Sequence, residues 1–444
     1  MHILWVTPFS KSSAIGQFSR LVTNELCKLG LDVTIASCEA DPPSKALCHE
    51  TSLPLLLGGC SVEDRLHDFD VVVYNIGNNY QYHGSVLNLI ERRSGLFIFH
   101  DLFLHDLFWG VLQAQGRLAE HDRVISSIYG DNVKLALPDM DYGSNLAHRV
   151  ANYPMFEWFA PRAIACVVHG KFGVPILENL CAGPVTYQPL AFFDPDDLST
   201  CADTQIIERP RNERFRLTTF GDVNPNKRVD SVIRAIGSSD FLRSTVEYSV
   251  IGRVSEADRE YLTQLAASHG VTLRVFGRVD SAQWEALSKA TDVSICLRFP
   301  TTETASATVI ESMLNGLPVV VTDTGFYRDL PNHLVFKVEP SLEEQSLRDQ
   351  LERLALDFGL RKRVSQEGKL WARETFSSVR YAAEIKTVLR DVVDCEAAVN
   401  VGFKLADVAT QLGLLPDDSM VVSWIERASQ LLSLSHVIPG QTKG

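Results

Sequence analysis

The sequence predicts an α/β protein with two domains built on parallel sheets. The chain has 444 residues, which exceeds the size at which a single hydrophobic core usually stops growing. Short apolar runs alternate with amphipathic stretches, and this alternation is typical of strand–helix–strand units with parallel strands. Hydrophobic residues make up 45% of the chain, which is enough to fill two cores.

The first half of the chain has the pattern of one parallel sheet. Residues 3–6 form an apolar run and residues 18–29 an amphipathic stretch, so we expect a strand followed by a helix. Further strands are expected at 33–36, 70–74, 96–99 and 165–168. Residues 109–158 break this rhythm with polar and aromatic residues. We interpret that segment either as an insertion that shapes an acceptor pocket or as a plain pair of surface helices.

The second half of the chain repeats the alternation. Its strands are expected at 217–220, 247–251, 272–276, 293–297 and 318–322. Apolar periodicity fades at 189–210, where Asp, Thr and Pro accumulate, and this indicates a linker. The resulting division is a first domain at 1–195, a second domain at 205–376, a helix at 377–395 and a helical extension of unassigned role at 396–444.

Composition and charge favour a cytoplasmic enzyme. The net charge of −13 disfavours general affinity for nucleic acid. The nine cysteines are scattered without a CxxC pair, which favours reduced thiols. Residues 1–8 lack the basic start of a signal peptide, and no apolar run has the length of a membrane span. We therefore expect a cytoplasmic protein whose membrane contact, where there is any, is peripheral and at the inner face.

Two glutamates, Glu303 and Glu311, lie eight residues apart at the entry to a predicted helix that ends at Gly316. Small residues lie between them, namely Thr304, Ala305 and Ser306. Backbone N–H groups at a helix N-terminus can bind an anion such as a diphosphate. The carboxylates can accept hydrogen bonds from the hydroxyls of a sugar and a ribose, so this layout favours a sugar nucleotide. The alternative is a solvated helix carboxylate at Glu311 and a favourable helix-dipole contact at Glu303.

The loop at 221–228 can carry phosphate chemistry in the second domain. Asn224 opens a turn after a predicted strand, and Lys227 and Arg228 begin the next helix, whose dipole adds to their charge. The alternative is that both cations simply lie on the surface at a helix start. A Walker P-loop is excluded, because the second glycine and the Ser/Thr of that motif are absent.

Two further candidates follow strands of the first domain. Gly16 lies between the first strand and the first helix, where it either admits a ligand or serves an ordinary strand–helix turn. His100 follows the apolar strand 96–99, so it emerges at the carboxyl edge of the sheet, where it either serves the site or caps Asp101. A metal at His100 and His105 is disfavoured, because their spacing places them on different helical faces.

Several of these segments together resemble retaining, nucleotide-sugar-dependent glycosyltransferases of family 4. Glu303 and Glu311 match the Glu-x7-Glu signature of that family. The pattern common in bacterial members is matched by residues 74–79, His83 and 95–101. The strand–loop–lysine–helix segment that opens their nucleotide domain is matched by residues 220–228. The resemblance covers roughly residues 1 to 390.

The resemblance implies the GT-B fold, in which two Rossmann-like domains face each other across a cleft. A last helix at about 377–393 would return to the first domain. The implied activity is transfer of a sugar from a nucleoside-diphosphate sugar to a glycan, a lipid-linked saccharide or a protein, with retention of configuration. The implied setting is polysaccharide biosynthesis. The enzyme would need no cofactor and no metal, because fixed cations would stabilise the leaving diphosphate.

The resemblance also implies roles for individual residues. Glu303 would contact the hexose, Glu311 the ribose, and His100 the region of the donor sugar. Lys227 matches the family's phosphate-binding lysine, with Arg228 beside it. The turn that contains Arg278, together with the strand end at 296–299, would contribute to the base pocket.

Two positions depart from the family pattern and keep other functions open. Asp222 replaces the family's arginine, and the first loop has one glycine instead of two. These departures favour a second hypothesis, a non-catalytic subunit that binds sugar nucleotides or acts in assembly on the same fold. A third hypothesis is a GT-B epimerase.

Overall fold

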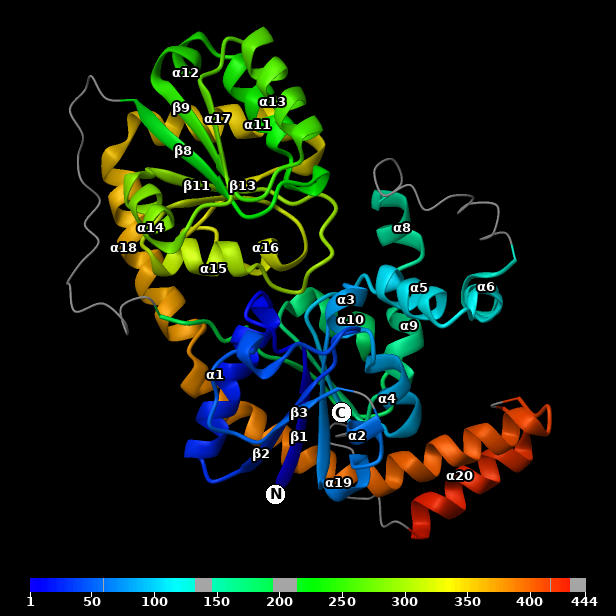
Figure 1. Cartoon of the computed structure of the whole chain (residues 1–444). Coiled ribbons are helices and arrows are strands. Elements are labelled where there is room, and N and C mark those ends of the chain that lie inside the picture. Colours follow the sequence, from blue (N-terminus) through cyan, green and yellow to red (C-terminus); the bar gives the residue numbers. More distant parts are fainter. Residues whose placement is uncertain (59, 132–145, 195–213, 416, 432–444) are drawn as a thin grey trace, which may run out of the picture.

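The computed structural model describes residues 1–58, 60–131, 146–194, 214–415 and 417–431. Two lobes are stacked, each built around one parallel sheet with helices on both faces (Figure 1). The first sheet has seven strands in the order β3-β2-β1-β4-β5-β6-β7, and the second has six in the order β10-β9-β8-β11-β12-β13. The expected fold of two Rossmann-like domains is confirmed.

The first sheet contains every strand that the sequence predicts for it. Its strands are β1 (His2–Thr7), β2 (Asp32–Ser37), β3 (Leu55–Leu57), β4 (Val71–Ile76), β5 (Leu96–Phe99), β6 (Ala165–Val168) and β7 (Val185–Tyr187). The central strands are continuous buried apolar runs, as expected for a sheet covered on both faces. The two edge strands, β3 and β7, were not predicted, because they are only three residues long and half-buried.

Helices cover both faces of the first sheet and extend one side of the domain. They are α1 (Ala14–Lys28), α2 (Cys60–Glu63), α3 (Tyr80–His83), α4 (Val86–Arg92), α5 (His105–Ala114), α6 (Leu118–Tyr129), α8 (Leu146–Asn152), α9 (Phe156–Phe159) and α10 (Val174–Leu177). The described part of the irregular segment 109–158 is therefore mostly helical. It is more than a surface pair, because its Val111 and Trp158 pack in the domain core and its Arg149 forms a buried ion pair with Asp106 at 2.7 Å.

The second sheet has the same construction. Its strands are β8 (Phe215–Phe220), β9 (Val246–Ile251), β10 (Leu273–Gly277), β11 (Val293–Cys296), β12 (Val319–Thr322) and β13 (Phe336–Val338). Its helices are α11 (Val229–Gly237), α12 (Asp240–Thr245), α13 (Glu256–Ser268), α14 (Ser281–Ala290), α15 (Ala307–Leu314), α16 (Gly325–Asp329), α17 (Glu343–Leu356) and α18 (Phe358–Thr375). All five predicted strands are present, and the edge strand β13 is additional. Most of the expected linker, from residue 195 onward, lies outside the described residues.

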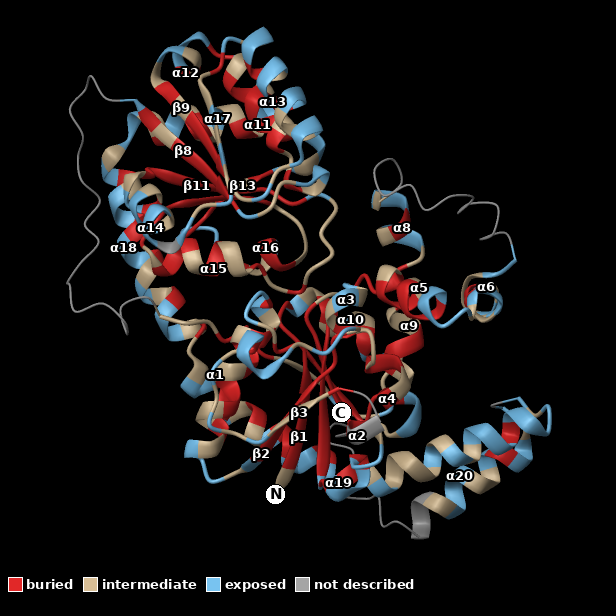
Figure 2. Ribbon diagram, viewed as in Figure 1, coloured by how far each residue is buried: buried red, intermediate tan, exposed pale blue. Residues whose placement is uncertain are grey.

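The chain then returns to the first domain through α19 (Ser378–Gln411), which packs along α1 (Figure 1). Tyr381, Ile385 and Leu389 are buried on this helix, at the i, i+4 spacing of one helical face. The division expected at residues 395 and 396 falls inside this single 34-residue helix. A second helix, α20 (Ser419–Leu431), packs against its outer part. Both are mostly exposed or half-buried there, in contrast to the buried sheets (Figure 2).

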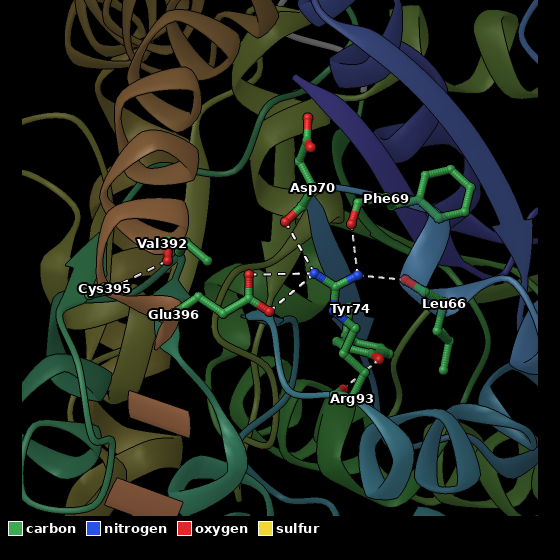
Figure 3. A network of polar contacts seen from close by, with 8 residues as sticks. All are labelled: Leu66, Phe69, Asp70, Tyr74, Arg93, Val392, Cys395 and Glu396. Carbon is green, nitrogen blue, oxygen red and sulfur yellow. Dashed lines mark hydrogen bonds and ion pairs between the residues drawn. The ribbon is translucent and has the colours of Figure 1, made fainter. Parts of the chain in front are cut away.

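A cluster of polar contacts fixes the middle of α19 to the first domain (Figure 3). Arg93 forms an ion pair with Glu396 of α19 at 3.1 Å. The same guanidinium donates hydrogen bonds to three main-chain carbonyls between residues 66 and 70, at 2.5 to 3.1 Å. Tyr74 donates its hydroxyl proton to the carbonyl of Arg93 at 2.8 Å.

None of the helices in the described ranges combines the length and apolar character that a bilayer-spanning segment requires.

Candidate functional site

The two domains meet where strand β5 ends. Residues 302–304 of the second domain run antiparallel to residues 100–102 of the first. The N–H of Leu102 donates to the carbonyl of Thr302 at 3.0 Å, and the N–H of Thr304 donates to the carbonyl of His100 at 2.8 Å. Asp101 and Glu303 lie opposite each other in this bridge. The carboxyl edges of both sheets thus come together, which is where ligands bind in open α/β folds.

The contacts of Thr304 differ from those expected. We predicted that it would help to bind the donor at the start of a helix. Its hydroxyl instead donates to the carbonyl of Phe99 at 2.6 Å, and the residue is fully buried. Because both its N–H and its hydroxyl are bonded to the end of β5, Thr304 joins the two domains and is not available to a ligand.

Glu303 is held by Tyr327, which the sequence analysis did not identify, and by Arg298, which lies in the strand end 296–299 that was expected to contribute to the base pocket. The hydroxyl of Tyr327, on α16, donates to Oε1 of Glu303. Nε of Arg298, directly beyond β11, lies 3.4 Å from the same oxygen. Burial, followed by the charge of Glu303, raises the pKa of Tyr327 well above its usual range, so the phenol stays protonated and remains a donor. The orientation of the Glu303 carboxylate is therefore fixed from two sides.

Lys227 is buried in a short turn, Pro225–Lys227, between β8 and α11. Its Nζ donates to the carbonyl of Phe220, the last residue of β8, at 2.8 Å. Burial, followed by the positive charge of Arg298, lowers the pKa of Lys227 to about 7. Gly221 makes this arrangement possible, since its φ of +87° favours glycine and an added Cβ would lie 2.5 Å from Nζ.

The neighbouring candidates Arg228 and Asn224 contribute less than expected. Arg228 forms an ion pair with the buried Glu343 of α17 at 2.9 Å. This contact anchors α11 to α17, so the structure does not support the expected diphosphate contact of Arg228. Asn224 precedes the turn, and its side chain makes no capping hydrogen bond.

Gly16 has a packing role. It lies in the first turn of α1, where its N–H donates to the side chain of Ser13, the N-cap residue, at 3.0 Å. A Cβ at this position would lie 2.7 Å from the carbonyl oxygen of Pro8 and 2.9 Å from the ring of His49. The close approach of α1 to the preceding loop therefore requires glycine, and this reason is independent of any ligand.

The hydrogen bonds of His100 define its tautomer. Asn75 donates its Nδ2 proton to the carbonyl of Val6 at 3.0 Å, so its Oδ1 is the acceptor in the 3.2 Å contact with His100 Nε2. His100 thus carries its proton on Nε2, and Nδ1 is left as an acceptor. Burial, followed by the charge of His169, lowers the pKa of His100 well below its usual range. The imidazole is therefore neutral and can accept a hydrogen bond from a sugar hydroxyl.

The second glutamate, Glu311, lies on α15, which follows β11. The turn of Lys227 follows β8, the neighbour of β11 in the sheet. Burial raises the pKa of Glu311 to about 7, and its carboxylate has no hydrogen-bond partner in the described part of the chain. Ala305 is half-buried and Ser306 is buried at the start of the same helix. An unpaired, largely buried carboxylate is well suited to accept hydrogen bonds from a ribose.

Arg278 lies apart from this group. It is exposed beyond β10, the edge strand, which is separated from β11 by β9 and β8. The structure therefore brings together Lys227, Arg298, Glu303 and His100, and it leaves Arg278 at the periphery. Arg298 carried one sequence signal, because it is a cation at the end of a buried strand.

Comparisons with known proteins agree with this architecture. Residues 203–371 match the family model described as Glycosyl transferases group 1. A comparison with curated proteins gave no match. The structure is similar to that of the Anabaena protein HepE in complex with UDP and glucose, with a TM-score of 0.57, 16% sequence identity, and coverage of 88% of this chain and 99% of that chain.

Two further solved structures are similar over most of their length. Sucrose-phosphate synthase from Thermosynechococcus elongatus has a TM-score of 0.58 at 12% identity, with 88% of this chain and 99% of that chain covered. WaaG, a glycosyltransferase involved in lipopolysaccharide biosynthesis, has a TM-score of 0.55 at 14% identity, with 87% and 99% covered. The class defined by these findings is a GT-B fold whose second domain matches group 1 glycosyltransferases.

Proposed function

We propose that the protein is a retaining glycosyltransferase that transfers a sugar from a nucleoside-diphosphate sugar to a glycan, a lipid-linked saccharide or a protein. One observation carries the proposal: a buried lysine, a buried arginine and an oriented carboxylate meet at the carboxyl edge of the second sheet, where the first domain closes over them. The family match of the second domain and the UDP and glucose bound to HepE support a nucleotide-sugar donor.

In the proposed reaction, the bond between C1 of the sugar and the leaving phosphate oxygen breaks, and its electron pair passes to that oxygen. The acceptor hydroxyl bonds to C1 from the same face, and its proton passes to the leaving phosphate. Retention then needs no protein nucleophile. Lys227 stabilises the charge that develops on the diphosphate, which is the role that a metal ion has in other transferases.

The remaining residues position the donor. Glu303, oriented by Tyr327 and Arg298, accepts hydrogen bonds from the hexose hydroxyls. His100 offers Nδ1 to the same sugar from the first domain. Glu311 accepts hydrogen bonds from the ribose. Membrane contact of the protein, where the acceptor is lipid-linked, is proposed to be peripheral.

Thermal unfolding of the full chain with UDP-, GDP-, ADP- and dTDP-sugars tests the proposal, because a ligand that binds only the folded state raises Tm. We expect the sugar nucleotides of one base to raise the Tm of the protein. In the presence of acceptor, the matching donor should release nucleoside diphosphate. Binding without any turnover would favour a non-catalytic subunit. Asp222 and the single glycine of the first loop are the two features that favour this alternative. A donor returned with altered sugar stereochemistry would favour an epimerase.

A further inference from the structure

Position 222 cannot provide a cation for a diphosphate. Oδ2 of Asp222 forms an ion pair with Arg253 at 2.9 Å, and Oδ1 accepts a hydrogen bond from the N–H of Arg253 at 2.9 Å. The Arg253 side chain is 74% exposed. The loop at 221–228 contains two cations, Lys227 and Arg228. Arg228 is paired with Glu343, whereas Lys227 forms its hydrogen bond with a main-chain carbonyl.

Arg298 lies next to this loop, at the end of a neighbouring strand. Strand β11 pairs with β8, and Lys227 Nζ is bonded to the last carbonyl of β8. The N–H of Arg298 donates to Thr322 Oγ1 at 3.0 Å, which fixes its main chain at the end of β12. Only 8% of Arg298 is exposed. The residue is therefore held at the same carboxyl edge as Lys227.

The guanidinium of Arg298 is held through two of its three nitrogens. Nη1 donates to the carbonyl of Leu297 at 2.9 Å, and Nε contacts Glu303. Nη2 donates no hydrogen bond within the described part of the chain. Two buried cations beside one carboxylate leave an excess of positive charge, which is unfavourable unless an anion completes the group. Burial, followed by the positive charge of Arg298, lowers the pKa of Lys227.

We propose that Arg298 is the second cation of the diphosphate site and binds a phosphate oxygen through Nη2, replacing the arginine that is absent at position 222. The inference rests on the proposed function and concerns the same site. Arg298 thereby links both halves of the donor, because its Nε side orients Glu303 for the sugar while its Nη2 side binds the leaving group. A purely structural Arg298 would neutralise Glu303 without any preference for diphosphates.

Calorimetric titration of the full chain distinguishes these roles. UDP, GDP, ADP and dTDP are compared with the matching monophosphates, which retain base and ribose. For the base that binds wild type, we expect the diphosphate to bind more tightly than the monophosphate. Arg298→Gln should reduce the ratio of diphosphate affinity to monophosphate affinity about 10- to 100-fold, which is the value of one charge-assisted hydrogen bond. Affinity for the monophosphate should change little. The matched control is Arg253→Gln, which should keep the advantage.

An undiminished advantage in Arg298→Gln would overturn the proposal, and its loss in Arg253→Gln alone would assign the role to Arg253. Far-UV circular dichroism establishes that each variant is folded. If Arg298→Gln does not fold, Arg298→Lys retains the charge but lacks the planar fork, and we expect a several-fold smaller advantage; a full advantage overturns the proposal there as well. Failure of all four diphosphates to bind wild type would instead remove the proposed function itself.

Discussion

Asp101 and Glu303 lie opposite each other in an antiparallel β-bridge although they belong to different domains. Burial, together with the nearby charge of Glu303, raises the pKa of Asp101 to about 7. Two carboxyl groups thus lie at the point where the domains touch. Because the charge of Glu303 in the second domain contributes to the raised pKa of Asp101 in the first, the docking of the domains and the ionisation of Asp101 are linked.

This link predicts how Asp101 affects stability as pH changes. An aspartate ionises near pH 4 in the unfolded chain. Between about pH 4 and 7 the folded state therefore binds the extra proton, and the free energy of unfolding falls as pH rises. Asp101→Asn removes the ionisable group and with it this loss of stability. It keeps a side-chain oxygen for the N–H of Asn78, which donates to Oδ2 of Asp101 at 2.9 Å in the wild type. We expect the Tm of the variant relative to wild type to be higher at pH 8 than at pH 5. An equal difference at both pH values would contradict the raised pKa.

Lys227→Ala should weaken nucleoside-diphosphate binding and slow transfer by about 1.5–3 kcal/mol, the value of a hydrogen bond to a charged group. The matched control is Arg228→Ala, which removes the next cation in the chain. It should lower Tm, because Glu343 is left buried without its partner, and it should leave diphosphate affinity nearly intact. Steady-state kinetics and calorimetry measure both effects. Unchanged kcat/KM in Lys227→Ala would remove this lysine from the site.

Diphosphate affinity should fall as pH rises from 7 to 9. The pKa of Lys227 is about 7, so the free protein loses this charge over that interval, while an anion favours the protonated form. The groups that act on Lys227 are Arg298, Cys296, Glu303 and Asp222. Arg298→Gln removes the largest of these electrostatic effects and should move the decline to higher pH. Calorimetry in buffers of different ionisation enthalpy should also detect proton uptake on binding at pH 8.

Activity should persist in excess EDTA. The proposed leaving-group stabilisation relies on Lys227 and Arg298, and fixed cations can take the place of a metal ion in this role. Transfer is measured with and without the chelator after dialysis. Complete loss of activity that Mg²⁺ or Mn²⁺ restores would contradict the mechanism.

The sequence was sufficient to predict the central strands of both sheets, because each is a short segment rich in apolar residues and mostly buried. It did not reveal β3, β7 and β13, since edge strands of three residues are too short to leave a pattern. Local spacing placed Lys227 in a loop between a strand and a helix, where the structure shows it buried, and its contact with the diphosphate stays a prediction. It could not show that Arg228 pairs with Glu343, which is more than a hundred residues away in the chain.

The same limit applies to the residues around Glu303. Tyr327 lies on α16, beyond β12, and meets Glu303 only in the folded domain. Arg298 and Glu303 share the loop between β11 and α15, but their contact depends on the path of that loop, which leaves no periodic pattern in the sequence. Thr304 was assigned to the donor from its place before a helix. Its contact with β5 depends on how the domains dock, and the sequence contains no periodic signal for that arrangement.

The most direct measurement for the whole account compares the two glutamates, which are assigned to different parts of one donor. Glu303→Gln should reduce turnover of the nucleotide sugar and leave affinity for the free nucleoside diphosphate nearly unchanged, since that ligand has no sugar to contact. Glu311→Gln should weaken both ligands, by about 1.5–3 kcal/mol, or roughly 10- to 100-fold, because the ribose is present in each. Calorimetry with folded variants resolves such differences. Equal losses of diphosphate affinity in the two variants would contradict the proposed placement of the donor.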